Sequence, residues 1–334
     1  MILQTPEDQR IYEEELRPLL PRQIFDAHVH VWDADAFPGG FAFPPQDCCA
    51  RFGGTFTLAQ WRGIMKEILP DNEPWINCFG TPHRLYDRDK VPPVNRRTEF
   101  AEVIVSPEDS AETMARRIEE SHAVGVKPYL NYAALFYGKP DSQVEVREML
   151  TPEQLQYLDA HKRTVTFHIP RSGRFADPLN PRQMLEICEK YPNIRMIFAH
   201  IGRAYFMKNI RESNIADFVQ FPNVYFDTAM LNNAELLKYA FDHFPAERIL
   251  FGSDSPIALL HGKSVEINNQ YAYLMGEDYR IGTAIYDQSH AVRFTTFFYE
   301  QLRGILQAAT TRKMREDVLF NNARKLFAEA QADA

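Results

Sequence analysis

The sequence predicts a single-domain (β/α)8 TIM barrel of the α/β class, and three observations support that prediction. The chain has 334 residues, which suits a barrel of about 250 residues with insertions. Short apolar runs alternate with helical patterns, as in parallel βαβ units. Four of these runs end in a polar residue at near-equal spacing: His168, His200, Asp227 and Asp254. The C-terminal ends of barrel strands meet at one mouth, so we expect these four side chains to gather there.

The expected strands are eight short runs, each bounded by turn or helix signals: 23–30, 75–79, 100–105, 126–132, 164–168, 194–200, 224–227 and 249–254. We expect helices over 58–69 and 108–123 and helix starts near 151, 181, 205, 232 and 290. An open doubly wound sheet is the alternative fold. It usually has a Gly-rich phosphate loop after its first strand, where this chain has His-Val-His-Val-Trp.

The barrel is expected over about residues 24–327, after a short N-terminal extension with a polar helix over 7–20. A long insertion over about 255–289 follows the eighth strand and contains several tyrosines, including Tyr271 and Tyr273. Its position predicts that it lies over the mouth of the barrel. It would serve there as a lid or substrate wall, or else as an oligomer contact.

Composition limits the partners and the compartment. The net charge of −8 argues against nucleic acids and anionic membranes as partners. There is no apolar run of about 18 residues, and the N-terminus lacks a signal-peptide pattern. We therefore expect a cytoplasmic protein that acts on a small molecule, with homo-oligomerisation left open. The four cysteines show no metal-type pairing and are expected to be free thiols: Cys48, Cys49, Cys78 and Cys188.

A metal site is predicted from the first strand and two later strand ends. His28 and His30 are two residues apart, so on a strand both imidazoles point to the same face. His168 and Asp254 would add a third imidazole and a carboxylate. This set suits one divalent ion, with Zn²⁺ preferred and Mn²⁺ or Fe²⁺ also compatible. The ion would bring the pKa of a bound water from about 15.7 toward about 7.

The remaining strand-end residues have expected catalytic roles. Asp254 can bind the ion and also accept a proton from the attacking water. His200 is either a further ligand or a residue that orients or deprotonates the water, and we expect the second role because the ligand set is complete without it. Asp227 is expected to fix the tautomer of an imidazole, or else to bond to a neighbouring loop.

The ordered motifs resemble the amidohydrolase superfamily, and within it the amidohydrolase-2 group of metal-dependent TIM-barrel enzymes. They begin with Asp-Ala-His-Val-His-Val-Trp at 26–32 and continue with Phe-Ala-His-Ile-Gly-Arg at 198–203 and Leu-Phe-Gly-Ser-Asp-Ser-Pro at 250–256. The C-terminal Phe-Asn-Asn-Ala-Arg-Lys-Leu-Phe at 320–327 is also similar to that group. The resemblance implies that His28, His30, His168 and Asp254 are ligands and that His200 is catalytic.

Some members of the superfamily hold two metals bridged by a carboxylated lysine on strand 4. Lys127 is the only lysine near that strand, and we place it near the strand's beginning, followed by Pro128. This is a poor match to a bridging position. We therefore expect one metal, with Lys127 as a charge inside the barrel that pairs with an acidic neighbour.

The substrate and the reaction are less constrained by the sequence. Arg171 and Arg203 each follow a site histidine by three residues and would lie above the metal, where an arginine fork can bind an anion. The alternative is that each pairs with a loop carboxylate such as Asp177. The expected reaction is hydrolysis of a small ester, lactone or amide, with an anionic or sugar-derived substrate. Non-oxidative decarboxylation, which the resemblance also implies, is the alternative.

Overall fold

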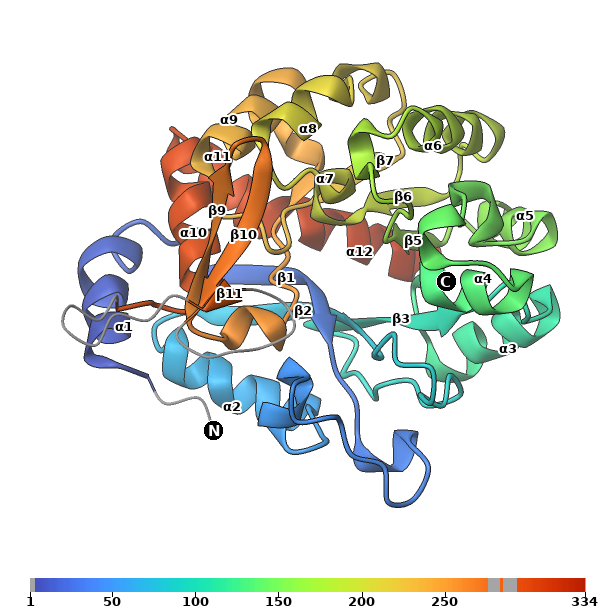
Figure 1. The fold of residues 1–334 in the computed structure, drawn as a ribbon, viewed down its shortest axis with the longest axis horizontal. Coiled ribbons are helices and arrows are strands. Elements are labelled where there is room, and N and C mark those ends of the chain that lie inside the picture. The colour runs from blue at the N-terminus through green and yellow to red at the C-terminus, as the bar shows by residue number, and fades with distance from the viewer. Residues whose placement is uncertain (1–3, 276–282, 285–292, 334) are drawn as a thin grey trace.

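The structure is a computed structural model that describes residues 4–275, 283–284 and 293–333 (Figure 1). Eight parallel strands form one sheet in chain order: β1 (Gln23–His30), β2 (Glu73–Phe79), β3 (Glu99–Val105), β4 (Gly125–Pro128), β5 (Thr164–Phe167), β6 (Arg195–Phe198), β7 (Val224–Asp227) and β8 (Ile249–Leu250). Hydrogen bonds from Ala27 N to Phe251 O and from His30 N to Ser255 O join β1 to the segment after β8. The sheet is therefore a nearly closed TIM barrel, as the sequence predicts.

Helices follow the strands around the outside of the barrel (Figure 1): α2 (Leu58–Ile68), α3 (Ala111–Ser121), α5 (Pro152–Ala160), α6 (Leu179–Lys190), α8 (Met207–Glu212), α9 (Ala234–His243) and α10 (Phe297–Ala308). Side-chain caps fix several of the helix starts. Thr57 and Thr151 accept from the backbone N–H of Gln60 and Gln154, whose side chains accept in return from the cap backbone. Each of these capping boxes satisfies donors that the first helical turn leaves free.

The last helix, α12 (Asn322–Ala332), closes the N-terminal end of the barrel. Phe327 stacks on Phe25 of β1 with ring centroids 5.3 Å apart, and Phe100 of β3 packs against both rings. These rings are almost entirely buried. The 320–327 motif thus seals the end of the barrel opposite the mouth.

Several predicted boundaries are wrong, and the shape of the barrel end explains why. The fourth strand ends at Pro128, and residues 130–137 form a helix, α4 (Leu130–Tyr137), where strand and loop were expected. The eighth strand is only Ile249–Leu250. The predicted helix over 7–20 is α1 (Pro6–Ile11) continued by a π-helical turn to Leu16. After β4 and β8 the backbone bends away from the sheet as soon as the inter-strand hydrogen bonds end. The pattern of apolar residues does not reveal where this happens.

The insertion after β8 forms a small sheet of its own, with β10 (Gln270–Met275) paired between β9 (Gly262–Ile267) and β11 (Thr283–Ala284). β9 and β10 rise as an orange pair in front of α10 (Figure 1). The predicted helix start near 290 and the insertion residues 276–282 and 285–289 lie outside the described residues. None of the described helices is long and apolar enough to span a membrane.

Candidate active site

The first strand supplies two histidines, and the Nδ1 atom of each ring is held by a hydrogen bond. The Nδ1 atom of His28 lies 2.8 Å from a carboxylate oxygen of Asp227, and the Nδ1 atom of His30 lies 2.7 Å from the carbonyl oxygen of Gly80. Both partners only accept hydrogen bonds, so each Nδ1 carries the proton. In the neutral form of each ring the lone pair then lies on Nε2. The predicted same-face pair is therefore in the tautomer that binds a metal through Nε2.

Asp254 brings a carboxylate to the same point. Its Oδ1 lies 3.5 Å from the Nε2 of His28 and 3.3 Å from the Nε2 of His30. One donor atom from each of these three residues lies within 4.8 Å of the others. Burial, with the charge of Lys127 nearby, lowers the pKa of His28 to about 4. Burial would raise the pKa of the Asp254 carboxyl, but its close contacts with His30 and the other histidine rings lower it overall.

These three donors fit a divalent cation. The group offers two imidazole nitrogens and a carboxylate, and histidine and aspartate bind metal ions through these atoms in their deprotonated forms. The identity of the ion does not follow from this donor set, because imidazole and carboxylate accept several divalent metals.

His168, the fourth predicted ligand, lines the same cavity but is not a member of the three-residue group. It follows β5, and its ring centroid lies 5.2 Å from that of His200. Its Nδ1 is buried and has no hydrogen-bond partner among the described residues. Burial, with the charge of Arg203, lowers its pKa well below the usual value. A buried neutral imidazole with an unused nitrogen suits a ligand that completes its contacts when an ion enters.

His200 is held by its backbone as well as by its ring. Residues 200–203 follow β6 with positive φ angles, including 58° at His200. A Cβ on Gly202 would lie 2.7 Å from the ring of Phe175, so glycine is needed at this close approach. The Nδ1 of His200 lies 2.9 Å from the carbonyl oxygen of Ala229 and must donate to it. The free Nε2 can therefore only accept a proton, and burial lowers the pKa of the ring.

Asp227 connects the two histidines. One carboxylate oxygen accepts from His28 Nδ1, and the other accepts from the backbone N–H of His200 at 2.7 Å and of Ala229 at 3.1 Å. The side chain is fully buried. Burial would raise its pKa, but the charge and hydrogen bond of His28 hold it at about 2. This is the position the sequence predicted for a residue that fixes an imidazole tautomer.

Lys127 is closer to the site than the sequence suggested. It is the third of four residues in β4 rather than near its beginning, and its Nζ lies 3.5 Å from His28 Nε2. It has no ion pair among the described residues, although an acidic partner was expected. Its Nζ packs 4.5 Å from the centroid of the Phe79 ring. Burial lowers its pKa to about 8, against the attraction of Asp227 and two other carboxylates.

Sequence reasoning missed Tyr129. Its hydroxyl lies 3.0 Å from His30 Nε2, whose lone pair accepts the hydrogen bond. A metal bound to His30 would use the same lone pair, so Tyr129 has to turn toward another acceptor when an ion enters. The available signal was its position two residues after Lys127 in the expected fourth strand, 126–132, where side chains two residues apart point to the same face.

The two predicted arginines have different surroundings. Arg171 Nε forms an ion pair with Asp177 at 2.8 Å, which was the alternative considered from the sequence. Arg203 has no carboxylate partner among the described residues; its Nη1 donates to the carbonyl oxygen of Ile169 at 2.9 Å. Neither side chain is among the residues that line the site cavity. Arg203 is thus the one whose charge remains available next to His168.

The cavity over the histidines has a volume of about 340 Å³. Apolar and polar side chains share its wall beyond the metal group: Pro82, Tyr129, Leu130, Asn131, Asp141, His168, His200 and Ile257. The insertion approaches from one side. Tyr271 of β10 stacks on Tyr205 with ring centroids 4.6 Å apart, and Tyr205 lies 5.7 Å from the His200 ring. The described part of the insertion therefore lines the cavity at Ile257 and is one aromatic ring away from His200 at Tyr271.

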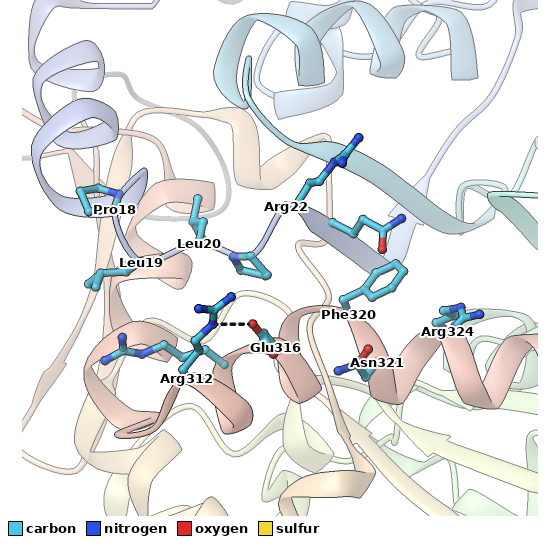
Figure 2. Close-up of a pocket in the computed structure, with 12 residues that line it drawn as sticks. Pro18, Leu19, Leu20, Arg22, Arg312, Glu316, Phe320, Asn321 and Arg324 are labelled. Carbon is cyan, nitrogen blue, oxygen red and sulfur yellow. Dashed lines mark hydrogen bonds and ion pairs between the residues drawn. The ribbon is translucent and has the colours of Figure 1, made fainter.

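A second cavity, of about 670 Å³, lies far from this chemistry, beside the start of β1 (Figure 2). Its walls come from residues 18–23 and from the segment around α11 (Arg312–Glu316), where Arg312 pairs with Glu316. It contains none of the predicted site residues. Its size alone does not make it the active site.

Comparisons with known proteins agree with the fold and the motifs. The amidohydrolase family model Amidohydro_2 matches residues 25–328. A solved "amidohydrolase 2" from Bifidobacterium longum subsp. infantis is 15% identical with a TM-score of 0.54, covering 92% of this chain and 99% of that one. A probable 2-pyrone-4,6-dicarboxylic acid hydrolase from Acinetobacter baumannii is 13% identical with a TM-score of 0.54, covering 91% and 99%.

A 2,6-dihydroxybenzoate decarboxylase, solved with 2,6-dihydroxybenzoate, is 12% identical with a TM-score of 0.55, covering 92% of this chain and 100% of that one. Comparison with curated protein sequences gave no match. At these identities the solved structures establish the fold alone. The family model covers nearly the whole barrel, and the chain therefore belongs to the amidohydrolase (Amidohydro_2) family.

Proposed function

We propose that the chain is a metal-dependent hydrolase that cleaves an ester, lactone or amide bond in a small molecule. One observation carries the proposal. Three donor atoms, on His28, His30 and Asp254, converge beside a fourth residue, His200, whose free nitrogen can only accept a proton. A cation site next to a proton acceptor is what hydrolysis by an activated water requires.

In this proposal His28, His30, His168 and Asp254 hold one ion, with Zn²⁺ preferred. When bound, the ion would polarise the substrate carbonyl and lower the pKa of a coordinated water toward about 7. Asp227 keeps His28 in the tautomer that binds the ion. A carboxylate that accepts from the second ring nitrogen of a metal-binding histidine commonly has this role. Asp254 balances the charge of the ion and accepts a hydrogen bond from the attacking water.

His200 moves the proton. Its pKa is lowered by burial, so the ring is neutral at neutral pH, and its Nδ1–H is already donated to Ala229. We assign Nε2 as the acceptor of the proton of the attacking water. The water oxygen bonds to the acyl carbon, the carbon–heteroatom bond breaks, and the proton passes from Nε2 to the leaving oxygen or nitrogen. Protonation, transfer and regeneration of His200 thus balance in one turnover.

The cavity limits the substrate to a small molecule. A volume of about 340 Å³ is at the lower end of the range for small-molecule sites. Pro82, Leu130 and Ile257 offer apolar contact, and Asn131 offers a polar one. Arg203 is the proposed contact for an anionic group, and a substrate without such a group would be a neutral, sugar-derived lactone. The Acinetobacter relative is named as a hydrolase of a pyrone dicarboxylic acid, which supports testing lactones first.

The test separates hydrolysis from decarboxylation by their products. The chain is stripped with a chelator, reloaded with Zn²⁺ or Mn²⁺, and supplied with lactones, amides and aromatic carboxylates in turn. We expect metal-dependent hydrolysis without CO₂, followed as proton release from a lactone or ester and as free amine from an amide, and its loss in His200→Ala. Release of CO₂ from an aromatic carboxylate, with no turnover of any lactone or amide, would refute the hydrolase and favour a decarboxylase like the dihydroxybenzoate enzyme.

A further inference from the structure

A second group of metal-binding side chains lies outside the candidate active site. Asp47, Cys48 and Cys49 are consecutive, and the two cysteines open the short 3-10 helix Cys48–Phe52 in the long loop between β1 and α2. A sulfur of each cysteine and a carboxylate oxygen of Asp47 all lie within 4.8 Å of one another. Both cysteines are free thiols. The spacing of the cysteines alone had suggested no metal-type pairing, because it does not reveal how the helix turn gathers the three side chains.

Local structure holds these three groups together. The carboxylate of Asp47 caps the helix by accepting from the backbone N–H of Cys49 at 3.0 Å. The Cys48 and Cys49 thiols hydrogen-bond to each other beside this carboxylate. Two thiols and a carboxylate thus crowd one another without a cationic partner for Asp47 among the described residues. A cation in place of the thiol protons would relieve that crowding.

We propose that Asp47, Cys48 and Cys49 form a site for one thiophilic divalent cation of the Zn²⁺ class, separate from the ion in the barrel mouth. Thiolates favour soft or borderline ions such as Zn²⁺ over hard ions such as Mg²⁺ or Mn²⁺. Zinc binds thiolate sulfur at about 2.3 Å, so two sulfurs on one tetrahedral ion lie roughly 3.8 Å apart. The donor atoms of this group lie within 4.8 Å of one another, which is compatible with that geometry.

The binding step is balanced in protons and charge. The ion displaces one proton from each thiol to solvent, and the two thiolates and the carboxylate then carry three negative charges against two positive ones. A water completes the fourth position. Cys48 is buried, with 4% of its surface exposed, while Asp47 and Cys49 are half-buried. The site therefore has an entry path for an ion and one wall closed to solvent.

The site would brace the loop that leaves the catalytic strand. The side chain of Trp32, two residues after His30, donates from Nε1 to the carbonyl oxygen of Gly54 at 3.0 Å, just beyond this helix. Trp32 also pairs with Phe56 through the backbone. These contacts hold the two ends of the loop over residues 32–56 together, next to His30. An ion at Cys48 and Cys49 would stiffen that loop. This inference does not depend on the proposed reaction.

Cadmium titration of the full chain tests the site, because Cd²⁺ bound to thiolate gives an ultraviolet charge-transfer absorbance that imidazole and carboxylate ligands do not. We expect a band that saturates once this site and the barrel mouth are both filled, is lost in Cys49→Ser and Cys48→Ser, and is retained in the matched control Cys188→Ser. Cys188 is also a buried free thiol but lies on α6. A band that survives Cys49→Ser, or no band in the wild-type chain, would overturn the proposal.

A second measurement, made on the wild-type chain, tests the site even if the cysteine variants fail to fold. Zn²⁺ is added before a thiol-alkylating reagent, and the modified cysteines are identified by mass spectrometry. We expect Zn²⁺ to slow alkylation of Cys49, and to do so equally in a His28→Ala chain whose mouth site is damaged. Equal alkylation with and without Zn²⁺ would refute the site. Protection that disappears in His28→Ala would assign the effect to the barrel mouth and refute it also.

Discussion

Replacing Asp227 by Asn should disable the metal site by changing one tautomer. The two side chains have nearly the same shape, but the amide has only one accepting oxygen. That oxygen is required by the backbone N–H groups of His200 and Ala229, which lie 2.7 and 3.1 Å from the carboxylate. The amide NH₂ would then face Nδ1 of His28, so that Nδ1 becomes the acceptor and Nε2 carries the hydrogen. The lone pair of His28 would be lost to the ion.

The size of the effect follows from the burial of the pair. His28 and Asp227 have side chains 1% and 0% exposed, so water cannot replace the lost acceptor. Loss of such an outer partner typically lowers metal affinity by about 10–100-fold, which equals about 1.4–2.7 kcal/mol. Competition between the protein and a chromogenic chelator for Zn²⁺ measures this change. Asp177→Asn is the matched control, because Asp177 pairs with Arg171 away from the metal group. Unchanged affinity in a folded Asp227→Asn chain would refute the reasoning.

Three other perturbations give separate results. His200→Ala should keep the metal but lower turnover by about 10²–10⁴-fold, and metal content that falls with activity would make His200 a ligand instead. Arg203→Met should weaken the binding of an anionic substrate by about 2–5 kcal/mol, measured through KM, whereas Arg171→Met should not. Equal effects of the two substitutions would contradict the different pairing of the two arginines. Burial raises the pKa of Asp8, but hydrogen bonds with His261 and two threonines hold it at about 2. The stability that this depressed pKa contributes is present above pH 3.8 and is lost as the pH falls toward 2. The free energy of unfolding, measured by denaturant titration, should therefore fall more over this pH range in the wild type than in Asp8→Asn.

Local rules were enough to predict the barrel and the first part of the site. Side chains alternate along a strand, so His28 and His30 had to share a face, and the regular spacing of strand ends put Asp227 and Asp254 near them. These inferences need only the period of a strand and the topology of parallel units. They do not depend on which residues pack against each other.

Contacts between distant segments set the limits of the prediction. The left-handed turn at His200 depends on Gly202 packing against Phe175, and the bend after Pro128 places Tyr129 against His30. The choice of Asp177 as the partner of Arg171 is likewise a choice among nearby carboxylates that sequence spacing leaves open. Element boundaries and ion pairs of this kind depend on contacts in the assembled barrel. The strands can be predicted from the local sequence without knowledge of those contacts.

The most direct test of the account is zinc stoichiometry in a chain that cannot use the thiol group. Cys49→Ser protein is dialysed to equilibrium against Zn²⁺ and its metal content is measured, alone and with His28→Ala and His30→Ala added. The account predicts one zinc ion per Cys49→Ser chain and none when both histidines are removed, with the fold retained by circular dichroism. A folded triple variant that still binds one zinc ion with unchanged affinity would contradict the assignment of the metal site.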